Sequence, residues 1–357
     1  MMTNIINLTS TIMNTASIAV IIPYYNGSKT IERALKSVFT QTIAAFECIV
    51  VNDGSKPDER QALELLQQNY SFTIIDQTNQ GQSSARNTGV AATKADYICF
   101  LDQDDFYFPE HNEVLLNIVP EQKARFGFVY ANISEADGEG HIIDTHMLRS
   151  QKGTHPKFGP IINLLKLNLF ILPSATLIAK KAYETVGGFD PQFIGYEDDD
   201  LFIRLIRAGF DHNYIDHPVT AWCVSSQSTS QNRIKMGRSC FKFFQKLIRL
   251  FPDDLIGHHY YFRDGLLNRF GKEFIADVIN LTILHSIDKK HHQEVHQRLN
   301  DYATLVYQNA SIGLFYKIKL WLMIMILKML PRAPKLFTQP LRRIHRLPWL
   351  RRLIGIT

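Results

Sequence analysis

Two carboxylates separated by a single residue, Asp102 and Asp104, follow an apolar run in this sequence, and Asp105 comes directly after them. The run, residues 98–101, has the composition of a buried strand, in which aspartate is disfavoured. Mg²⁺ and Mn²⁺ prefer carboxylate oxygens and share their other coordination positions with water and phosphates. The pattern therefore predicts a divalent cation or a polyphosphate at the end of a strand. A solvated acidic turn is the alternative, which this pattern alone leaves open.

The elements that would position these acids alternate along the chain. Apolar runs predict strands at residues 18–23, 46–51, 72–75 and 97–101. Helical spacing and a first-turn proline predict helices at 29–41, from Pro57 onward and at 82–92. Short links between strand and helix predict an α/β domain with a mixed, largely parallel sheet flanked by helices.

Polar side chains gather at the carboxyl ends of three of these strands. Tyr25 and Asn26 follow the first, Asp53 ends the second, and Asp102 and Asp104 follow the fourth. Ligands bind outside the carboxyl ends of the strands in open sheets of this kind. Any one of these groups has an ordinary explanation as a turn. Three strand ends that converge predict a single binding crevice.

A second acidic run lies further along the chain. Residues 197–200 read Glu-Asp-Asp-Asp, shortly after Gly187 and Gly188, and precede a predicted helix at 201–208. Acids at a helix N-terminus complement its dipole and cap its free N–H groups. One or two acids satisfy that need, so four in a row predict a further role.

Residues 131–160 are polar and contain glycine, and we expect a variable excursion there. The apolar run at 175–179 predicts one more strand. From about Arg238 onward the sequence has helical, aromatic and basic character without strand-like alternation.

Composition sets broad limits. A chain of 357 residues, 45% apolar and 20% charged, predicts a folded protein with one large domain and an appendage. Its four cysteines, Cys48, Cys99, Cys223 and Cys240, have no CxxC spacing. We interpret them as small buried hydrophobes, which favours a reducing compartment.

The charge is distributed unevenly. No Asp or Glu follows Asp301, and that tail holds ten Lys and Arg residues. Residues 1–301 carry the other 29 Lys and Arg against all 34 acids, so the rest of the chain is mildly acidic. Such asymmetry indicates an anionic surface as partner. No nucleic-acid-binding module is recognisable, so we expect a membrane and no nucleic acid.

One apolar run lies within this basic region. Residues 320–327 are wholly apolar but too few to span a bilayer, which needs about 20 residues. They could form a core helix or, with the basic residues around them, an interfacial membrane segment. We expect three regions: a flexible N-terminal tail at 1–17, the α/β domain at 18–237, and a helical, basic region at 238–357 in peripheral membrane contact.

The ordered motifs resemble one known family. Residues 18 to about 235 resemble the family 2 glycosyltransferases, which have the GT-A fold, whereas the last 120 or so residues lie outside the likeness. The matching segments, in the family's order, are residues 20–26 (VIIPYYN), 50–55 (VVNDGS), 79–81 (NQG), 85–89 (ARNTG), 100–105 (FLDQDD), 187–190 (GGFD) and 197–201 (EDDDL).

The resemblance implies an inverting transfer from a nucleotide-diphospho-sugar, with a UDP-sugar expected, to a hydroxyl of a saccharide or lipid-linked acceptor. It implies a hexosyltransferase-type enzyme (EC 2.4) of bacterial surface polysaccharide synthesis, on the cytoplasmic face of the cell membrane. By the family's roles, donor-binding residues are Pro23, Tyr25, Asp53, Arg86 and Asp102; Asp104 binds Mn²⁺ or Mg²⁺; Asp198 is the general base with Glu197 beside it.

One segment departs from the family pattern. Many relatives carry a histidine after the last strand that helps to hold the metal or the diphosphate. Residues 222–227 read Trp-Cys-Val-Ser-Ser-Gln here, without a histidine. His217 lies upstream, before Pro218, and we interpret it as a turn residue. The third metal ligand is therefore unassigned.

Three other functions can be compared with this one. A nucleotidyltransferase or a dinucleotide oxidoreductase would need a glycine-rich phosphate loop after the first strand, where this chain has Pro-Tyr-Tyr-Asn-Gly. A non-catalytic sugar-nucleotide-binding scaffold of a polysaccharide assembly complex remains the alternative. Asp104 and Asp198 favour catalysis, because a metal ligand and a base are the minimum that an inverting transfer requires.

Overall fold

The computed structural model describes residues 17–122, 124–150, 155–225, 231–280 and 289–329. The chain divides into two compact units. The sheet unit comprises the residues up to Phe158 together with Leu169–Gln231, and the helical unit comprises Gly159–Asn168 and the residues from Asn232 onward. Residues 1–16 of the tail predicted at 1–17, and residues 330–357 of the predicted basic region, lie outside the described residues.

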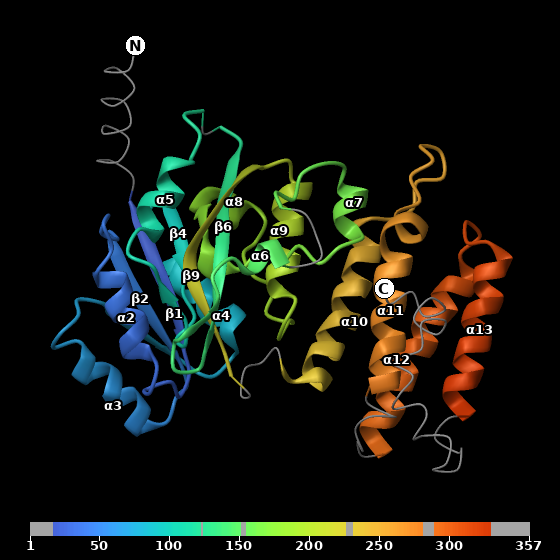
Figure 1. The fold of residues 1–357 in the computed structure, drawn as a ribbon, viewed down its shortest axis with the longest axis horizontal. Helices are drawn as coiled ribbons and strands as arrows, with labels where there is room; N and C mark the ends of the chain where they lie inside the picture. Colours follow the sequence, from blue (N-terminus) through green and yellow to red (C-terminus); the bar gives the residue numbers. More distant parts are fainter. Residues whose placement is uncertain (1–16, 123, 151–154, 226–230, 281–288, 330–357) are drawn as a thin grey trace. The chain divides into compact units, whose positions relative to one another are not determined.

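The sheet unit is a mixed, mostly parallel α/β sheet flanked by helices, as predicted (Figure 1). Its strand order is β3-β2-β1-β4-β8-β6-β9-β5, with β7 paired to β6. Strands β1, β2, β3 and β4 run parallel, whereas β8 is antiparallel to both β4 and β6. The strands are β1 (Ile18–Tyr24), β2 (Glu47–Asp53), β3 (Thr73–Gln77), β4 (Tyr97–Phe100), β5 (Phe106–Tyr107), β6 (Phe126–Asp137), β7 (Ile142–Asp144), β8 (Thr176–Ala179) and β9 (Asp211–Val224).

Helices cover both faces of the parallel strands. Alternate residues of a strand point to opposite faces. Val20 and Ile22 of β1 pack in the core with Leu35 of α2, whereas Ile21 faces α4. β1 and β2 are buried along nearly their whole length because neither of their faces meets solvent. The helices of this unit are α2 (Ile31–Phe39), α3 (Pro57–Leu66), α4 (Gln82–Ala92), α5 (His111–Asn117), α6 (Met147–Ser150), α8 (Lys180–Thr185) and α9 (Glu197–Arg207).

Part of the expected excursion at 131–160 is a strand, so that expectation is wrong for 131–137. β6 continues to Asp137 and pairs in parallel with β9. The polar residues that suggested a loop are buried and hydrogen-bonded. Asn132 donates to Asp216 (2.6 Å) and accepts from the amide of Leu148 (3.0 Å), and Ser134 donates to the Thr145 carbonyl (3.0 Å). Their polarity is satisfied inside the sheet.

The helical unit is helical where it is described, as predicted. It contains α7 (Ile161–Leu165), α10 (Arg233–Leu250), a π-helical turn (Phe262–Leu266), α11 (Leu267–Ile279), α12 (Lys289–Gln308) and α13 (Leu314–Met329). Its core is aromatic: Phe244 contacts the rings of Phe270, Phe274 and Tyr302 with centroids 5.0–5.6 Å apart. In the part of the chain that the structure describes, no helix has both the length and the hydropathy to cross a bilayer.

Gly89 sets how closely α4 approaches the sheet. A Cβ at this position would overlap Cγ2 of Ile21 and press on Val51. We expect Gly89→Val to lower the free energy of unfolding by about 1–3 kcal/mol, because overpacking forces the helix off the sheet. Urea denaturation measures the effect. Ser84→Val is the matched control, since it puts the same side chain into α4 where a Cβ already fits. Equal losses in the two variants would contradict this close packing.

Candidate active site

One side chain, that of Gln103, links the end of β1 to the acidic turn, which comprises residues 102–105 after β4. Gln103 accepts from the amide of Tyr25 (2.8 Å) and donates to its carbonyl (3.2 Å). The Tyr25 ring itself is half exposed, while Pro23 is buried in β1. The residue between the two aspartates thus fixes their distance from the end of β1. Gly27 leaves the room that the Gln103 side chain occupies.

Asp53 fixes the loop that leads into α4. Its carboxylate accepts from the amides of Gln80 and Gly81 (both 2.8 Å) and from the side chain of Gln77 (2.7 Å). Gly81 has a φ of 87°, a left-handed conformation that glycine adopts without strain. The role of Asp53 in donor binding stays a prediction. In the structure this carboxylate joins the end of β2 to the start of α4.

Arg86, one turn into α4, lies at the centre of the site. Its guanidinium is 2% exposed and contacts Oδ1 of Asp102 (2.5 Å) and Oε1 of Glu197 (3.4 Å). It also lies over the ring of Phe189, 5.0 Å from the centroid. The structure therefore brings together three predicted site residues: Arg86 on α4, Asp102 after β4 and Glu197 at the start of α9. The nearby carboxylates raise the pKa of Arg86, although its burial acts in the other direction.

The acidic turn holds its carboxylates in a crowded, partly dry environment. Burial and the charge of Asp102 raise the pKa of Asp104 to about 6, against the opposing effect of Arg33 and Arg86. Burial, with the charges of Asp102 and Asp104, also raises the pKa of Asp105 well above its usual range. Two adjacent groups that resist ionisation indicate a site where a cation would be favourable.

Arg33 of α2 was not anticipated from the sequence. Its Nη2 donates to the backbone oxygen of Asp104 (2.6 Å) and contacts Sγ of Cys223 (3.3 Å). Asp105 accepts from the amide of Cys223 (2.8 Å), so the turn is tied to β9 as well. Cys223 belongs to the segment in which many relatives have a histidine. Nothing in the local pattern of α2 separates Arg33 from an ordinary surface arginine.

The four acids of α9 have different partners. Glu197 accepts from Gln82, from Arg86 and from the amide of Gly195 (2.7 Å). Asp199 accepts from the amide of Leu169 (3.0 Å), and Asp200 binds Arg204 (2.7 Å).

Asp198 differs from its neighbours. Among the described residues its carboxylate accepts only the amide of Asp199 (2.8 Å). Burial, with the charges of Asp199 and Glu197, raises its pKa well above the usual range. The charge of Arg86 opposes this shift. In the described residues, Asp198 is thus the one carboxylate of the run that accepts from a single backbone amide within its own helix, whereas Glu197, Asp199 and Asp200 have partners elsewhere in the fold or an ion pair.

The glycine pair before α9 is held by two side chains. Arg204 donates to the carbonyls of Val186 (2.6 Å) and Gly188 (2.7 Å). Asn87, next to Arg86, accepts from the amide of Phe189 (2.9 Å) and donates to its carbonyl (2.8 Å). A Cβ on Gly188 would press on Asn87 and Tyr183. The ordered motifs at 85–89 and 187–190 are therefore in direct contact.

No histidine joins the acidic turn in the contacts of the described residues, and His217 pairs instead with Glu110 (3.3 Å). Nor do those residues contain a cluster of three or more His, Cys, Asp or Glu arranged to hold a metal ion. Any cation here would take ligands from one or two carboxylates and from a bound phosphate, an arrangement that Mg²⁺ commonly adopts.

The mixed, mostly parallel sheet with its flanking helices defines a GT-A-like fold. Solved structures of low sequence identity share it. S. aureus TarS 1–349 in complex with UDP-GlcNAc matches with a TM-score of 0.64 and 14% identity over 88% of this chain and 90% of that one. The mannosyltransferase PcManGT from Pyrobaculum calidifontis, in complex with GDP-Man and Mn²⁺, matches with a TM-score of 0.53 and 15% identity over 89% and 88%.

Sequence comparison gives the family. The model of glycosyl transferase family 2 matches residues 19–187, and that of the N-terminal domain of galactosyltransferase matches 173–224. An uncharacterized glycosyltransferase from Haemophilus influenzae is 32% identical over 57% of this chain and 67% of that relative. The amylovoran biosynthesis glycosyltransferase AmsB from Erwinia amylovora is 25% identical over 62% and 74%. This chain belongs to glycosyl transferase family 2, and it is a glycosyltransferase.

Two acids of α9, Asp200 and Asp198, should affect stability differently. Asp200→Asn should lower the free energy of unfolding at pH 7 by roughly 1.5–3 kcal/mol, since it weakens charge-assisted hydrogen bonds to Arg204. Asp198→Asn should leave it unchanged or raise it, because a carboxyl with a raised pKa in the folded state destabilises that state when ionised.

Chemical denaturation at several pH values measures both effects. Any gain from Asp198→Asn should fade as the pH falls from the raised pKa toward the ordinary aspartate range, where the wild-type carboxyl is protonated in both folded and unfolded states. A destabilising Asp198→Asn at pH 7 would show that Asp198 has a structural role.

Proposed function

We propose that the enzyme transfers a sugar, with inversion, from a nucleotide-diphospho-sugar to a hydroxyl of a saccharide or lipid-linked saccharide. The observation that carries this proposal is the junction of Arg86, Asp102 and Glu197, with the ionisable carboxylate of Asp198 one residue further along α9. Family membership supports the reaction class. A UDP-sugar is the proposed donor, in keeping with the UDP-GlcNAc bound by TarS.

Asp198 is the proposed general base. In an inverting transfer the acceptor oxygen attacks the anomeric carbon from the face opposite the diphosphate, so a carboxylate must remove its proton as the new bond forms. A base is most effective when its pKa lies near the working pH, and the raised pKa of Asp198 moves it in that direction. Glu197 supports it by fixing the first turn of α9 against Arg86 and Gln82.

The acidic turn fits a divalent cation, Mn²⁺ or Mg²⁺. Its carboxyls are of the type that these ions prefer, and burial and the charge of Asp102 raise the pKa of Asp104 more than Arg33 and Arg86 lower it. Asp104 would hold the ion, with Asp102 beside it. When bound, the cation would neutralise charge on the leaving diphosphate. The structural neighbour PcManGT was solved with Mn²⁺.

The remaining predicted donor residues line the same strand ends. The exposed Tyr25 ring and Pro23 would border the base, and Asp53, at the end of β2, would contact the base or the ribose. Arg86 would lie near the diphosphate, and Asp102, which it contacts, would approach the ribose. The biological role that we propose is bacterial surface polysaccharide synthesis at the cytoplasmic face of the membrane, in line with the relative AmsB.

A scaffold that binds sugar nucleotides without turnover is the competing function. A screen of UDP-, GDP- and dTDP-sugars by thermal shift identifies the donor, and hydrolysis of that donor in the presence of Mn²⁺ separates the two. An enzyme turns the donor over slowly even without its acceptor. Binding without any hydrolysis or transfer would favour the scaffold.

Asp198→Asn should retain donor affinity and lose at least ~10²-fold in transfer rate, the usual contribution of a general base. Single-turnover kinetics and nucleotide titration calorimetry measure the two quantities. Asp199→Asn is the matched control, because the carboxylate of Asp199 accepts from the amide of Leu169 instead. An inactive Asp199→Asn beside an active Asp198→Asn would place the base one residue later.

Asp104→Asn should abolish metal-dependent transfer while the fold stays intact. The amide keeps the shape of the side chain and loses the charge that binds a cation. Binding of Mn²⁺ in the presence of UDP, followed by electron paramagnetic resonance, should fall with activity. Near-normal turnover of this variant in EDTA would show that Asp104 binds no catalytic metal.

A further inference from the structure

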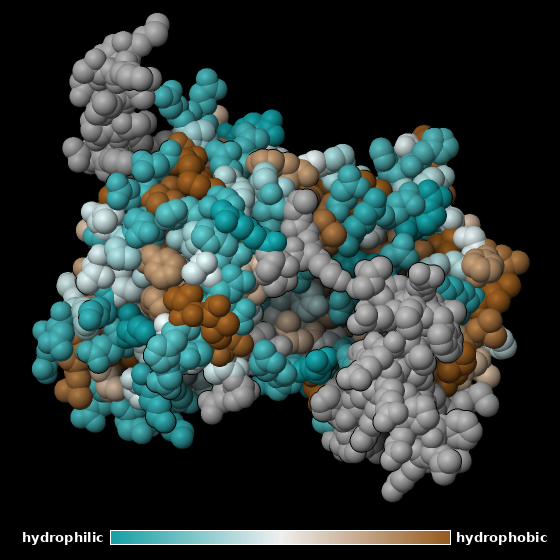
Figure 2. Space-filling model, viewed as in Figure 1, coloured by the Kyte–Doolittle hydropathy of each residue, from teal (hydrophilic) through white to brown (hydrophobic). Residues whose placement is uncertain are grey.

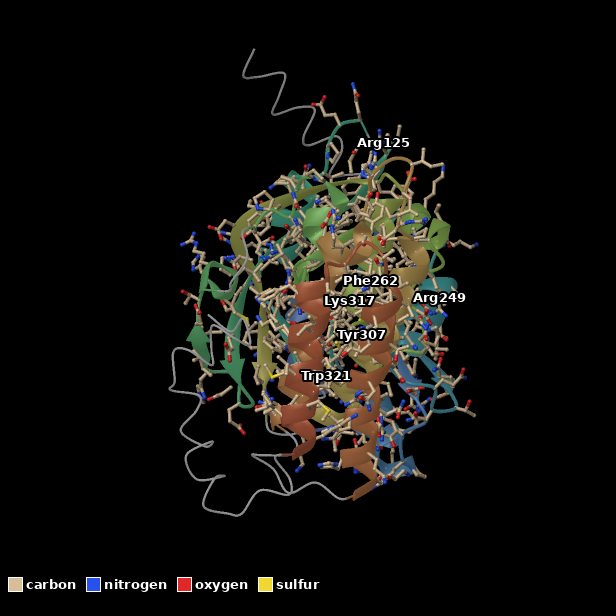
Figure 3. All side chains as sticks on the ribbon, turned by 90° about the vertical axis from the view of Figure 1, so that its right-hand side faces the viewer. Arg125, Arg249, Phe262, Tyr307, Lys317 and Trp321 are labelled. Carbon is tan, nitrogen blue, oxygen red and sulfur yellow. The ribbon has the colours of Figure 1, made fainter. Side chains whose placement is uncertain are left out.

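Helix α13 exposes one entirely apolar face. Seven large apolar side chains of this helix are 42–83% exposed: Leu314, Phe315, Ile318, Trp321, Leu322, Met325 and Ile326. Figure 2 shows hydrophobic side chains gathered at the right-hand margin of the helical unit, and Figure 3 views that margin directly, with Trp321 and Lys317 labelled on α13. An exposed apolar patch of this size on a folded unit indicates an interaction site.

The opposite face of the same helix is buried. Leu320, Met323, Ile324 and Leu327 are 7% exposed or less, and α13 packs on α12. Lys317 donates to the carbonyl of Tyr307 on α12 (2.9 Å), which fixes the start of α13. The exposed face is therefore held in place by the packing of the buried one.

Lysines border the exposed face on both sides. With 3.6 residues per turn, the seven apolar side chains fall within an arc of about 140° around the helix. Lys319 lies just beyond one edge of this arc, and Lys317 and Lys328 lie beyond the other. The helix contains no acidic residue. An apolar face bordered by cations is the pattern of a helix that lies in the plane of an anionic membrane surface.

Charge decides between the possible occupants of this face. A second copy of the chain, packed face to face, would bring its own three lysines against these three. The chain after residue 329 holds seven more Lys and Arg and no acid, so it would meet the same repulsion if it folded back. A leaflet rich in anionic lipids offers hydrocarbon to the apolar arc and negative charge to both of its edges.

We propose that the exposed face of α13 is the membrane-docking surface of this protein and that its occupant is an anionic bilayer. The helix lies parallel to the membrane, with Trp321 at the interface, where aromatic side chains settle. The inference rests on the proposed membrane location and identifies the part of the protein that contacts the membrane. It also predicts that apolar contact, and not the basic tail alone, holds the enzyme.

The test uses the full chain and liposome flotation with phosphatidylglycerol–phosphatidylcholine vesicles. Wild type should float with them and keep part of its binding in 1 M salt, because apolar contacts are not screened. Ile318→Glu combined with Met325→Glu should lower the partition at least about tenfold, since two side chains at the centre of the arc become charged. With Trp222→Phe and Trp349→Phe in both chains, so that Trp321 is the single tryptophan, the emission should shift to the blue on vesicles without the double substitution and not with it.

Ile256→Glu is the matched control, because Ile256 is 94% exposed in the same unit but lies outside α13. It should bind vesicles as wild type does. A double variant with wild-type partition would assign membrane binding to residues outside α13 and overturn the proposal. So would a wild-type chain that is dimeric by light scattering, that becomes monomeric in the double variant, and that ignores the vesicles.

Hydrolysis of the soluble donor without vesicles separates this inference from the proposed function. The double variant should hydrolyse it at the wild-type rate. Intact turnover in a chain that never binds vesicles refutes only the membrane surface. Vesicle binding that depends on Ile318 and Met325, in a chain without turnover, supports the surface and refutes the proposed reaction.

Discussion

One buried cation organises the candidate active site. The Arg86 guanidinium is almost fully removed from solvent, and a charge in such a position is tolerated only when carboxylates compensate it. Asp102 supplies one carboxylate from the turn after β4, and Glu197 supplies the other from the first turn of α9. The rings of Phe100 and Phe189 lie around the same group. The acidic turn and the acidic helix are therefore bound to α4, and through it to each other.

This constraint explains why the acids of the site have unequal roles. Glu197 and Asp102 are engaged by Arg86, Asp200 binds Arg204, and Asp199 anchors Leu169. Asp104 and Asp198 are left with raised pKa values and no compensating side-chain contact among the described residues. An ionised group in that position destabilises the fold. It is retained most readily where function uses it, as strained and perturbed groups at active sites generally are.

The sequence could predict those parts of the fold that depend on local periodicity. β1, β2, β4 and α4 fall where apolar runs and helical spacing place them, because strands buried on both faces leave a clear signal. β6 was missed since its buried polar residues find partners far along the chain. The same reason hides Arg33 and Gln103, whose partners lie more than 70 residues away. Nor could the sequence predict which of the four acids of α9 has which role. Their residue types are nearly the same, and they differ in the partners that the tertiary structure gives them.

The run at 320–327 shows a related ambiguity. Its sequence is compatible with a core helix and with an interfacial segment, and the structure has both properties in one helix. A helix with apolar residues on every side can stay folded in water only if one face is buried firmly enough to offset the exposure of the other. The contact of α13 with α12 provides that burial. The exposed face then adds no stability to the unit. A partner that is both apolar and anionic explains why this face combines apolar residues with bordering lysines.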